Sequence, residues 1–84
     1  MDIVAVEPLR ERILLLTFAN GERRLIDIAQ HFKFFGVFEP LNDDVFFRSV
    51  RVNPESGTIE WPNQADMCPD VLYGASKAVS ASAA

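Results

Sequence analysis

The dipeptide Asn20-Gly21 constrains the fold of this chain more than any other pair of residues. It lies between two strand-like apolar runs, Arg12–Phe18 and Glu22–Ile28. Asn and Gly are the residues that most readily adopt the two positive φ angles of a two-residue type I′ turn. The sequence therefore predicts an antiparallel hairpin with this turn at its tip.

Three further strands are expected around the hairpin. Ile3–Val6 is β-branched and is stopped by Pro8, which cannot donate a hydrogen bond to a neighbouring strand. Phe46–Val52 and Thr58–Trp61 are the other two. Within the hairpin, the four consecutive apolar residues of Ile13–Leu16 do not alternate with polar ones, which predicts a strand covered on both faces.

The segments between these strands predict short helices. Ile28–Phe38 has apolar side chains at three- and four-residue spacing, which favours one or two helical turns that end at Gly36. An Asn or Asp of residues 42–44 can cap a second helix over Val45–Phe47. Pro69 fits the first position of a third helix, where its missing N–H costs nothing.

These elements indicate the α+β class, with a small, mainly antiparallel sheet of four to five strands and one or two short helices on one face. A chain of 84 residues is long enough for one domain. We expect residues 1–75 to form that domain around a core rich in Phe. The Ala- and Ser-rich residues 76–84 have little to bury, so we expect a flexible tail.

The composition excludes several classes of protein. A single Cys, Cys68, cannot form an internal disulfide and is compatible with a reducing cytoplasm. The N-terminus has no signal-peptide pattern, and the longest apolar run is too short to span a bilayer. The net charge of −4 disfavours attraction to nucleic acid or anionic lipid. We therefore expect a cytoplasmic protein without a membrane partner.

Candidates for catalysis are sparse. His31 is the only histidine, so a triad or a His-rich metal site cannot form within one chain. Asp66, Asp70 and Cys68 are the best set for a metal-dependent or hydrolytic site. Each has a simpler structural use, since Asp66 can bond loop N–H groups, Asp70 suits a helix N-terminus and Cys68 precedes Pro69. No metal or cofactor is expected.

Two aromatic residues and two arginines complete the list of candidates. Trp61 and Tyr73 combine an apolar ring with a polar group, which suits both cores and binding interfaces. We expect Trp61 in the core, whereas Tyr73 is equally compatible with an interface. Arg48 and Arg51 fall on opposite faces of their predicted strand and therefore do not form one phosphate-binding stripe.

Several motifs occur in a fixed order along the chain. They are G-E-x-R-x-I-D from Gly21, V-F-E-P-L from Val37, F-x-x-V-R-V from Phe47, G-T-I-x-W-P from Gly57 and W-P-N-Q-A-D-x-x-P-D-x-L-Y from Trp61. Over residues 3 to 75 the chain resembles the bacterial family called domain of unknown function 2442. The resemblance implies a small α+β module without assigned chemistry. Some relatives carry a helix-turn-helix domain, and others are encoded beside toxin-like partners.

The chain departs from this family at Gln64, where relatives commonly have Gly. If the left-handed backbone of that position persists here, Gln64 carries about 1 kcal/mol of strain. The chain also has no room for a helix-turn-helix after Tyr73, so direct DNA binding by that route is not expected.

The function expected from the sequence is a non-enzymatic protein-interaction or regulatory module, such as an antitoxin-like partner of a small toxin-like protein. Candidate interaction or loop-organising residues are Trp61, Asn63, Asp66, Asp70 and Tyr73. The edge strand Ile3–Val6 could accept a strand from another protein or from a second copy of the chain. The alternatives are a small enzyme that uses Asp66, Asp70 and Cys68, and, third, a nucleic-acid-associated regulator.

Overall fold

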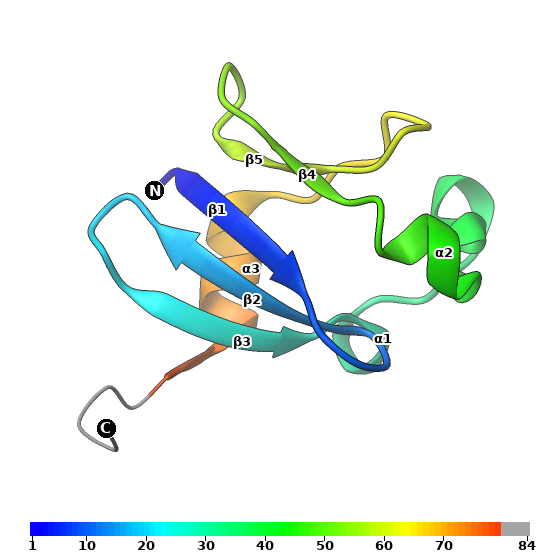
Figure 1. Ribbon diagram of the computed structural model, residues 1–84, viewed down its shortest axis with the longest axis horizontal. Coiled ribbons are helices and arrows are strands. Elements are labelled where there is room, and N and C mark those ends of the chain that lie inside the picture. The colour runs from blue at the N-terminus through cyan, green and yellow to red at the C-terminus, as the bar shows by residue number, and fades with distance from the viewer. Residues whose placement is uncertain (80–84) are drawn as a thin grey trace.

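The computed structural model describes residues 1–79 and contains two antiparallel sheets with short helices (Figure 1). The main sheet has four strands in the order β1-β2-β3-β6, and β4 pairs with β5 in a second sheet. The α+β class is therefore confirmed. The strands are β1 (Ile3–Pro8), β2 (Ile13–Phe18), β3 (Arg23–Asp27), β4 (Arg51–Asn53), β5 (Thr58–Glu60) and β6 (Lys77–Ala78). The helices are α1 (Ile28–His31), the 3₁₀ helix η1 (Gly36–Asn42), α2 (Asp44–Phe47) and α3 (Pro69–Ala75).

The central hairpin is confirmed, but its predicted turn type is wrong. β2 and β3 pair in the register Leu15↔Leu25. Only Gly21 has a positive φ, of 86°, and its N–H donates to Phe18 O at 2.8 Å. These features are those of a three-residue loop, in which a type I turn is followed by one left-handed residue. Asn20 stabilises the loop by accepting a hydrogen bond from the N–H of Glu22 at 2.9 Å.

The core lies on one face of the main sheet. In β2 buried side chains alternate with half-buried ones, as they do in a sheet with one solvated face, whereas β1 and β3 each have one buried residue, Ile3 and Ile26. Helix α3 lies behind this sheet in Figure 1, and the second sheet lies beside β1. The fully buried core side chains are Ile3, Leu14, Leu16, Phe18, Ile26, Ile28, Leu41, Phe47, Ile59, Trp61 and Leu72.

The opposite face of the main sheet is open. Figure 1 shows it turned to the viewer, with no element of residues 1–79 across it. Leu14 and Leu16 are buried, whereas Ile13 and Leu15 point to the open face and are half-buried. The prediction that this strand is covered on both faces is therefore wrong, because every described helix lies on the core side or beyond the sheet's end.

The predicted strand Phe46–Val52 is wrong over most of its length. Asp43 Oδ2 accepts a hydrogen bond from the N–H of Phe46 at 2.9 Å and caps a helical turn, which confirms the predicted short helix. Arg48 consequently ends α2 and is not on a strand face, so its predicted opposition to Arg51 does not occur. The strand begins only at Arg51 and pairs with β5 alone.

Two other boundaries differ from expectation. The helix after β3 ends at His31, and Phe32 closes it as the C-cap. Gly36 begins η1 with a φ of 60° and does not end a helix, so that prediction is wrong. Lys77 and Ala78 fall in the segment for which a flexible tail was expected, yet they pair with β3 as β6. Residues 80–84 of that segment lie outside the described part of the chain.

Truncation of Trp61 tests its place in the core. Its side chain is fully buried, and its indole Nε1 donates to Phe47 O at 2.9 Å. Trp61→Ala should lower the free energy of unfolding by about 3–5 kcal/mol. Trp61→Phe retains much of the packing but removes the indole hydrogen bond and leaves Phe47 O with only the 3.4 Å bond from Val50 N, at a cost of about 0.5–1.5 kcal/mol. Denaturant unfolding measures both, and an unchanged midpoint for Trp61→Ala would contradict the core placement.

Candidate interaction surfaces

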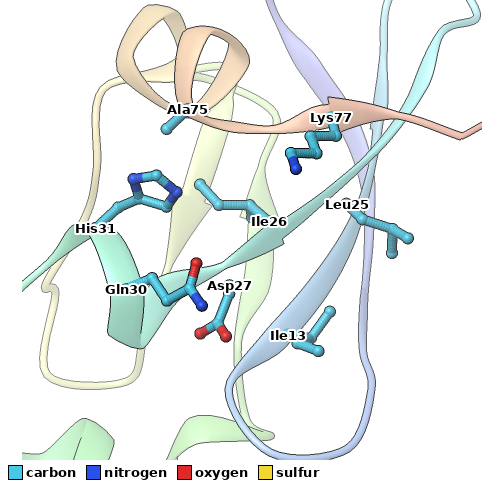
Figure 2. A pocket seen from close by; sticks show the side chains of 8 residues that line it. All are labelled: Ile13, Leu25, Ile26, Asp27, Gln30, His31, Ala75 and Lys77. Atoms are coloured by element: carbon cyan, nitrogen blue, oxygen red, sulfur yellow. The ribbon is translucent and has the colours of Figure 1, made fainter.

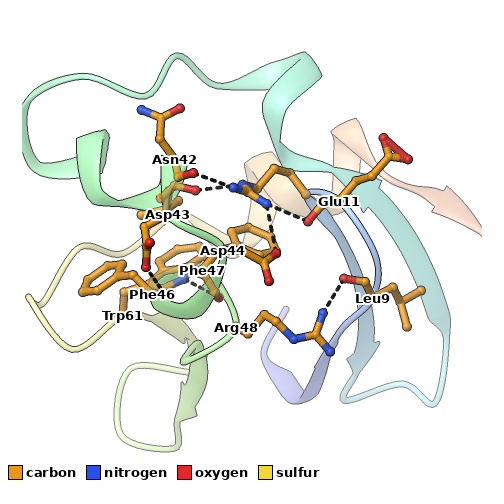
Figure 3. Close-up of polar contacts among 11 residues, drawn as sticks. Leu9, Glu11, Asn42, Asp43, Asp44, Phe46, Phe47, Arg48 and Trp61 are labelled. Atoms are coloured by element: carbon orange, nitrogen blue, oxygen red, sulfur yellow. Dashed lines mark hydrogen bonds and ion pairs between the residues drawn. The ribbon is translucent and has the colours of Figure 1, made fainter.

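Residues 35–47, here called the η1–α2 lobe, project beyond the end of the main sheet (Figure 1). Two residues of the W-P-N motif hold this lobe. The Trp61 indole bonds Phe47 O, and Asn63 Nδ2 donates to Val37 O at 2.9 Å. Figure 3 shows Trp61 beneath α2, with the capping carboxylate of Asp43 nearby. Trp61 and Asn63 therefore act as supports for the lobe.

Arg12 fastens the lobe to the start of β2 from the other side. Its guanidinium donates to Leu41 O at 2.8 Å and to Asn42 O at 2.6 Å, and it forms an ion pair with Asp44 at 3.3 Å. Arg48 adds a bond from α2 to Leu9 O at 3.1 Å, which is drawn in Figure 3. With contacts on both sides, the lobe has a fixed orientation relative to the sheet.

The lobe exposes large apolar side chains that the sequence did not identify as functional. Phe35 is 69% exposed, Val37 52% and Val45 78%. Phe34, Phe38 and Phe46 from the same stretch pack against the core instead. The sequence feature that points to this exposure is the number of Phe residues between positions 32 and 47. One turn of helix cannot bury all of them on one side.

The predicted acidic and thiol residues do not form a catalytic cluster. Asp70 pairs with the N-terminal amine at 3.2 Å, and Cys68 is the exposed N-cap of α3 without a capping hydrogen bond. The side chain of Asp66 is exposed, and Asn63 bonds the loop N–H of Ala65 in its place. Among residues 1–79, no group of three His, Cys, Asp or Glu side chains is placed to hold a metal ion.

Tyr73 joins α3 to the central hairpin. Its hydroxyl donates to Glu22 Oε1 at 2.8 Å, and its ring meets Phe18 edge-on at 5.1 Å. Arg24 lies over the ring at 4.2 Å, forms an ion pair with Glu22 and donates to Ser76 O and Oγ at 2.7 Å each. The hydroxyl and the ring of Tyr73 thus both have intramolecular partners.

The edge of β1 is partly occupied. Ile3 N donates to Gly57 O at 2.8 Å, so the turn between β4 and β5 covers the beginning of the strand. Toward the opposite edge of the sheet, a groove of about 250 Å³ opens next to β3, where β6 begins (Figure 2). It is lined by Ile13, Leu25, Ile26, Asp27, Gln30, His31, Ala75 and Lys77.

Gln64 has a φ of 69°, so the left-handed geometry expected at this position is present. The turn at Gln64 has the same pattern of hydrogen bonds as the hairpin turn at Gly21. In each, the N–H of the left-handed residue donates to the carbonyl three residues earlier at 2.8 Å. In each, the preceding Asn accepts from the N–H two residues later, at 2.9 Å for Asn20 and 3.1 Å for Asn63. One turn has Gly in the left-handed position, and the other has Gln.

Gln64→Gly should stabilise the protein. Removing the β-carbon relieves the left-handed strain, and the expected gain is about 1 kcal/mol, reduced by the greater entropy of Gly in the unfolded chain. Gln64→Ala is the matched control, because it removes the same polar group but keeps the β-carbon. Chemical denaturation compares the three proteins, and an equal gain for both variants would argue against strain at this residue.

The contact between Tyr73 and Glu22 predicts a pH dependence of stability. The hydrogen bond from Tyr73, followed by that from Arg24, holds the pKa of Glu22 below its ordinary value of 4.5. A carboxylate with a lowered folded-state pKa stabilises the fold above its ordinary value, and this stabilisation is lost as the pH falls through the folded-state pKa. Glu22→Gln should therefore be less stable than the wild type at neutral pH and should lose less stability below about pH 4.5.

Unfolding free energies measured between neutral pH and pH 3 test this dependence. Glu55→Gln is the control, since Glu55 is exposed in the turn between β4 and β5 and forms no ion pair within residues 1–79. Parallel curves for the wild type and Glu22→Gln would contradict the role of this carboxylate.

None of the helices in residues 1–79 has the length and apolar character required to cross a bilayer. Neither curated proteins nor solved structures provide a match to the chain. One family model does match, and it covers residues 3–78, which is nearly the whole sequence. The chain therefore belongs to the family described as "Protein of unknown function (DUF2442)".

Proposed function

We propose that this protein is a non-catalytic protein-binding module that docks its partner on the η1–α2 lobe. The observation that carries the proposal is the exposure of Phe35, Val37 and Val45 on a lobe that is otherwise well anchored. Phe is one of the residues enriched at protein–protein interfaces, and exposed apolar side chains that gather on a surface mark interaction sites.

The anchoring of the lobe is a second argument for binding, in addition to the exposure of its apolar side chains. Arg12 and Asn63 together hold the backbone of the lobe at both ends of η1. A surface that is already ordered in the free protein loses less conformational entropy when a partner binds. The contacts that the W-P-N motif makes to this lobe thus supply a fixed apolar surface.

The charge of the surface favours a basic partner. Glu39 and Asp43 are exposed on the lobe, Asp44 is exposed there but paired with Arg12, and the chain carries a net charge of −4. Opposite charge speeds the encounter of two proteins, and this effect weakens as salt is added. An antitoxin-like role, in which the module covers a small basic toxin-like protein, is the specific form of the proposal.

The placement of the candidate catalytic residues gives the enzymatic alternative less support. A nucleophile, a base and an orienting group must lie within hydrogen-bond reach of each other. Asp70 is instead paired with the N-terminal amine, and Cys68 has no hydrogen bond to an acid or base within residues 1–79.

Affinity capture with surface variants tests the proposal. The tagged wild-type protein, F35S/V37S and V71S are used to retain proteins from the native host at low and high salt. Val71 is 51% exposed on α3 and serves as the matched control for loss of an exposed apolar group. The wild type and V71S should retain the same partner at low salt, and F35S/V37S should not.

The retained protein is then purified, and its affinity for each variant is measured directly. Loss of a binding hot spot costs about 2 kcal/mol, so the dissociation constant of F35S/V37S should rise about thirtyfold. Equal affinities of the wild type and F35S/V37S would exclude the lobe as the docking surface. Absence of any retained protein, together with turnover by the purified protein, would favour the enzymatic alternative.

A further inference from the structure

One row of side chains crosses the open face of the main sheet. The strand registers place Glu7 opposite Leu15, Leu15 opposite Leu25 and Leu25 opposite Lys77. Residues directly opposite each other in an antiparallel sheet point to the same face. The row therefore begins with a negative charge on β1, continues with two leucines and ends with a positive charge on β6.

Within residues 1–79, the leucines of this row are not packed against the core and its charges are not paired. Leu25 is exposed and Leu15 half-buried, and neither packs against the core. Glu7 and Lys77 are exposed and take part in no ion pair within residues 1–79. Their backbones are three strand spacings apart, roughly 14 Å, which is too far for the two side chains to meet.

We propose that two copies of the chain associate through these open faces, with a two-fold axis parallel to the strands. Rotation about such an axis reverses the order of the row. Glu7 of each copy then faces Lys77 of the other, and Leu15 faces Leu25. Packed sheets lie about 10 Å apart, a distance that the side chains of Glu and Lys can bridge together.

Charge selects this axis over the alternative. A two-fold axis along the row would place Glu7 against Glu7 and Lys77 against Lys77, which is repulsive at both ends. With the axis along the strands, the neighbouring rows bring Arg23 opposite Thr17 and Asp27 opposite Ile13. No like charges lie directly opposite each other, although the two Arg23 and the two Asp27 side chains lie diagonally across the axis, one strand spacing apart. Asp27 is already engaged with the N–H of Ala29 at 3.1 Å. A two-fold contact buries the same patch on both copies and closes the assembly at two.

This inference goes beyond the proposed function because it concerns a different surface and a different partner. The η1–α2 lobe lies beyond the end of the sheet and not on its open face (Figure 1). Self-association is measured on the purified protein alone, whereas lobe binding requires a second protein. Failure of one therefore leaves the other in place.

Charge reversal tests the arrangement by sedimentation equilibrium. Glu7→Lys and Lys77→Glu each place like charges opposite each other at both ends of the interface, and each should weaken the dimer about tenfold. The double variant Glu7→Lys/Lys77→Glu restores opposite charges and should regain most of the affinity. Glu55→Lys makes the same charge change in the turn between β4 and β5 and should leave the dimer unchanged. Circular dichroism confirms that each variant is folded.

Cross-linking supplies a direct distance test. A zero-length carbodiimide reagent joins a carboxylate to an amine only when the two are in contact. In a mixture of isotopically light and heavy protein, the product between Glu7 and Lys77 should contain one light and one heavy peptide. A monomer at all accessible concentrations would overturn the proposal. So would a dimer in which the double variant is weaker than either single variant, or a dimer without the mixed product.

Discussion

The hydrogen bond from the Trp61 indole to Phe47 O joins the two parts of the molecule. Both residues are fully buried, and their rings are 6.0 Å apart. The indole bond, at 2.9 Å, is shorter than the 3.4 Å bond that Phe47 O also accepts from Val50 N, and it ties α2 to the end of β5. Because Asn63 follows two residues later and bonds Val37 O, the same stretch also fixes η1. The orientation of the lobe thus depends on Trp61.

The one-sided core explains why the protein has two surfaces available for contact. Helix α3 and the second sheet supply the groups that bury the inner side chains of the main sheet. The short chain has no further described element for the outer face. The apolar residues there, Leu15 and Leu25, remain between Glu7 and Lys77. The lobe, by contrast, is held by side chain to backbone hydrogen bonds from Arg12 and Asn63.

Local signals in the sequence predicted the parts of the fold that depend on local chemistry. The hairpin at Gly21, the cap at Asp43 and the helix that begins at Pro69 are all present. The turn type was missed, because Asn20 accepts a hydrogen bond from Glu22 and does not adopt a positive φ. Of the candidate residues, Trp61 lies in the core as expected. The exposed apolar side chains of the lobe were not foreseen, because exposure depends on which of several Phe residues the core can accommodate.

The sequence by itself determined the hairpin, from residues close together in the chain, and the class and family, from the order of motifs along nearly its whole length. The family resemblance raised a left-handed backbone at Gln64 as a condition, and the structure shows that it is present. Only the tertiary structure decided that Lys77 pairs beside Leu25, that β4 and β5 form a separate sheet and that Tyr73 is engaged by Glu22. The physical reason is that the contacts of Lys77 and Tyr73 join residues far apart in the sequence, and that a local hairpin such as β4–β5 does not itself specify which sheet it joins. Their stability depends on the packing of the whole chain, which no local propensity encodes.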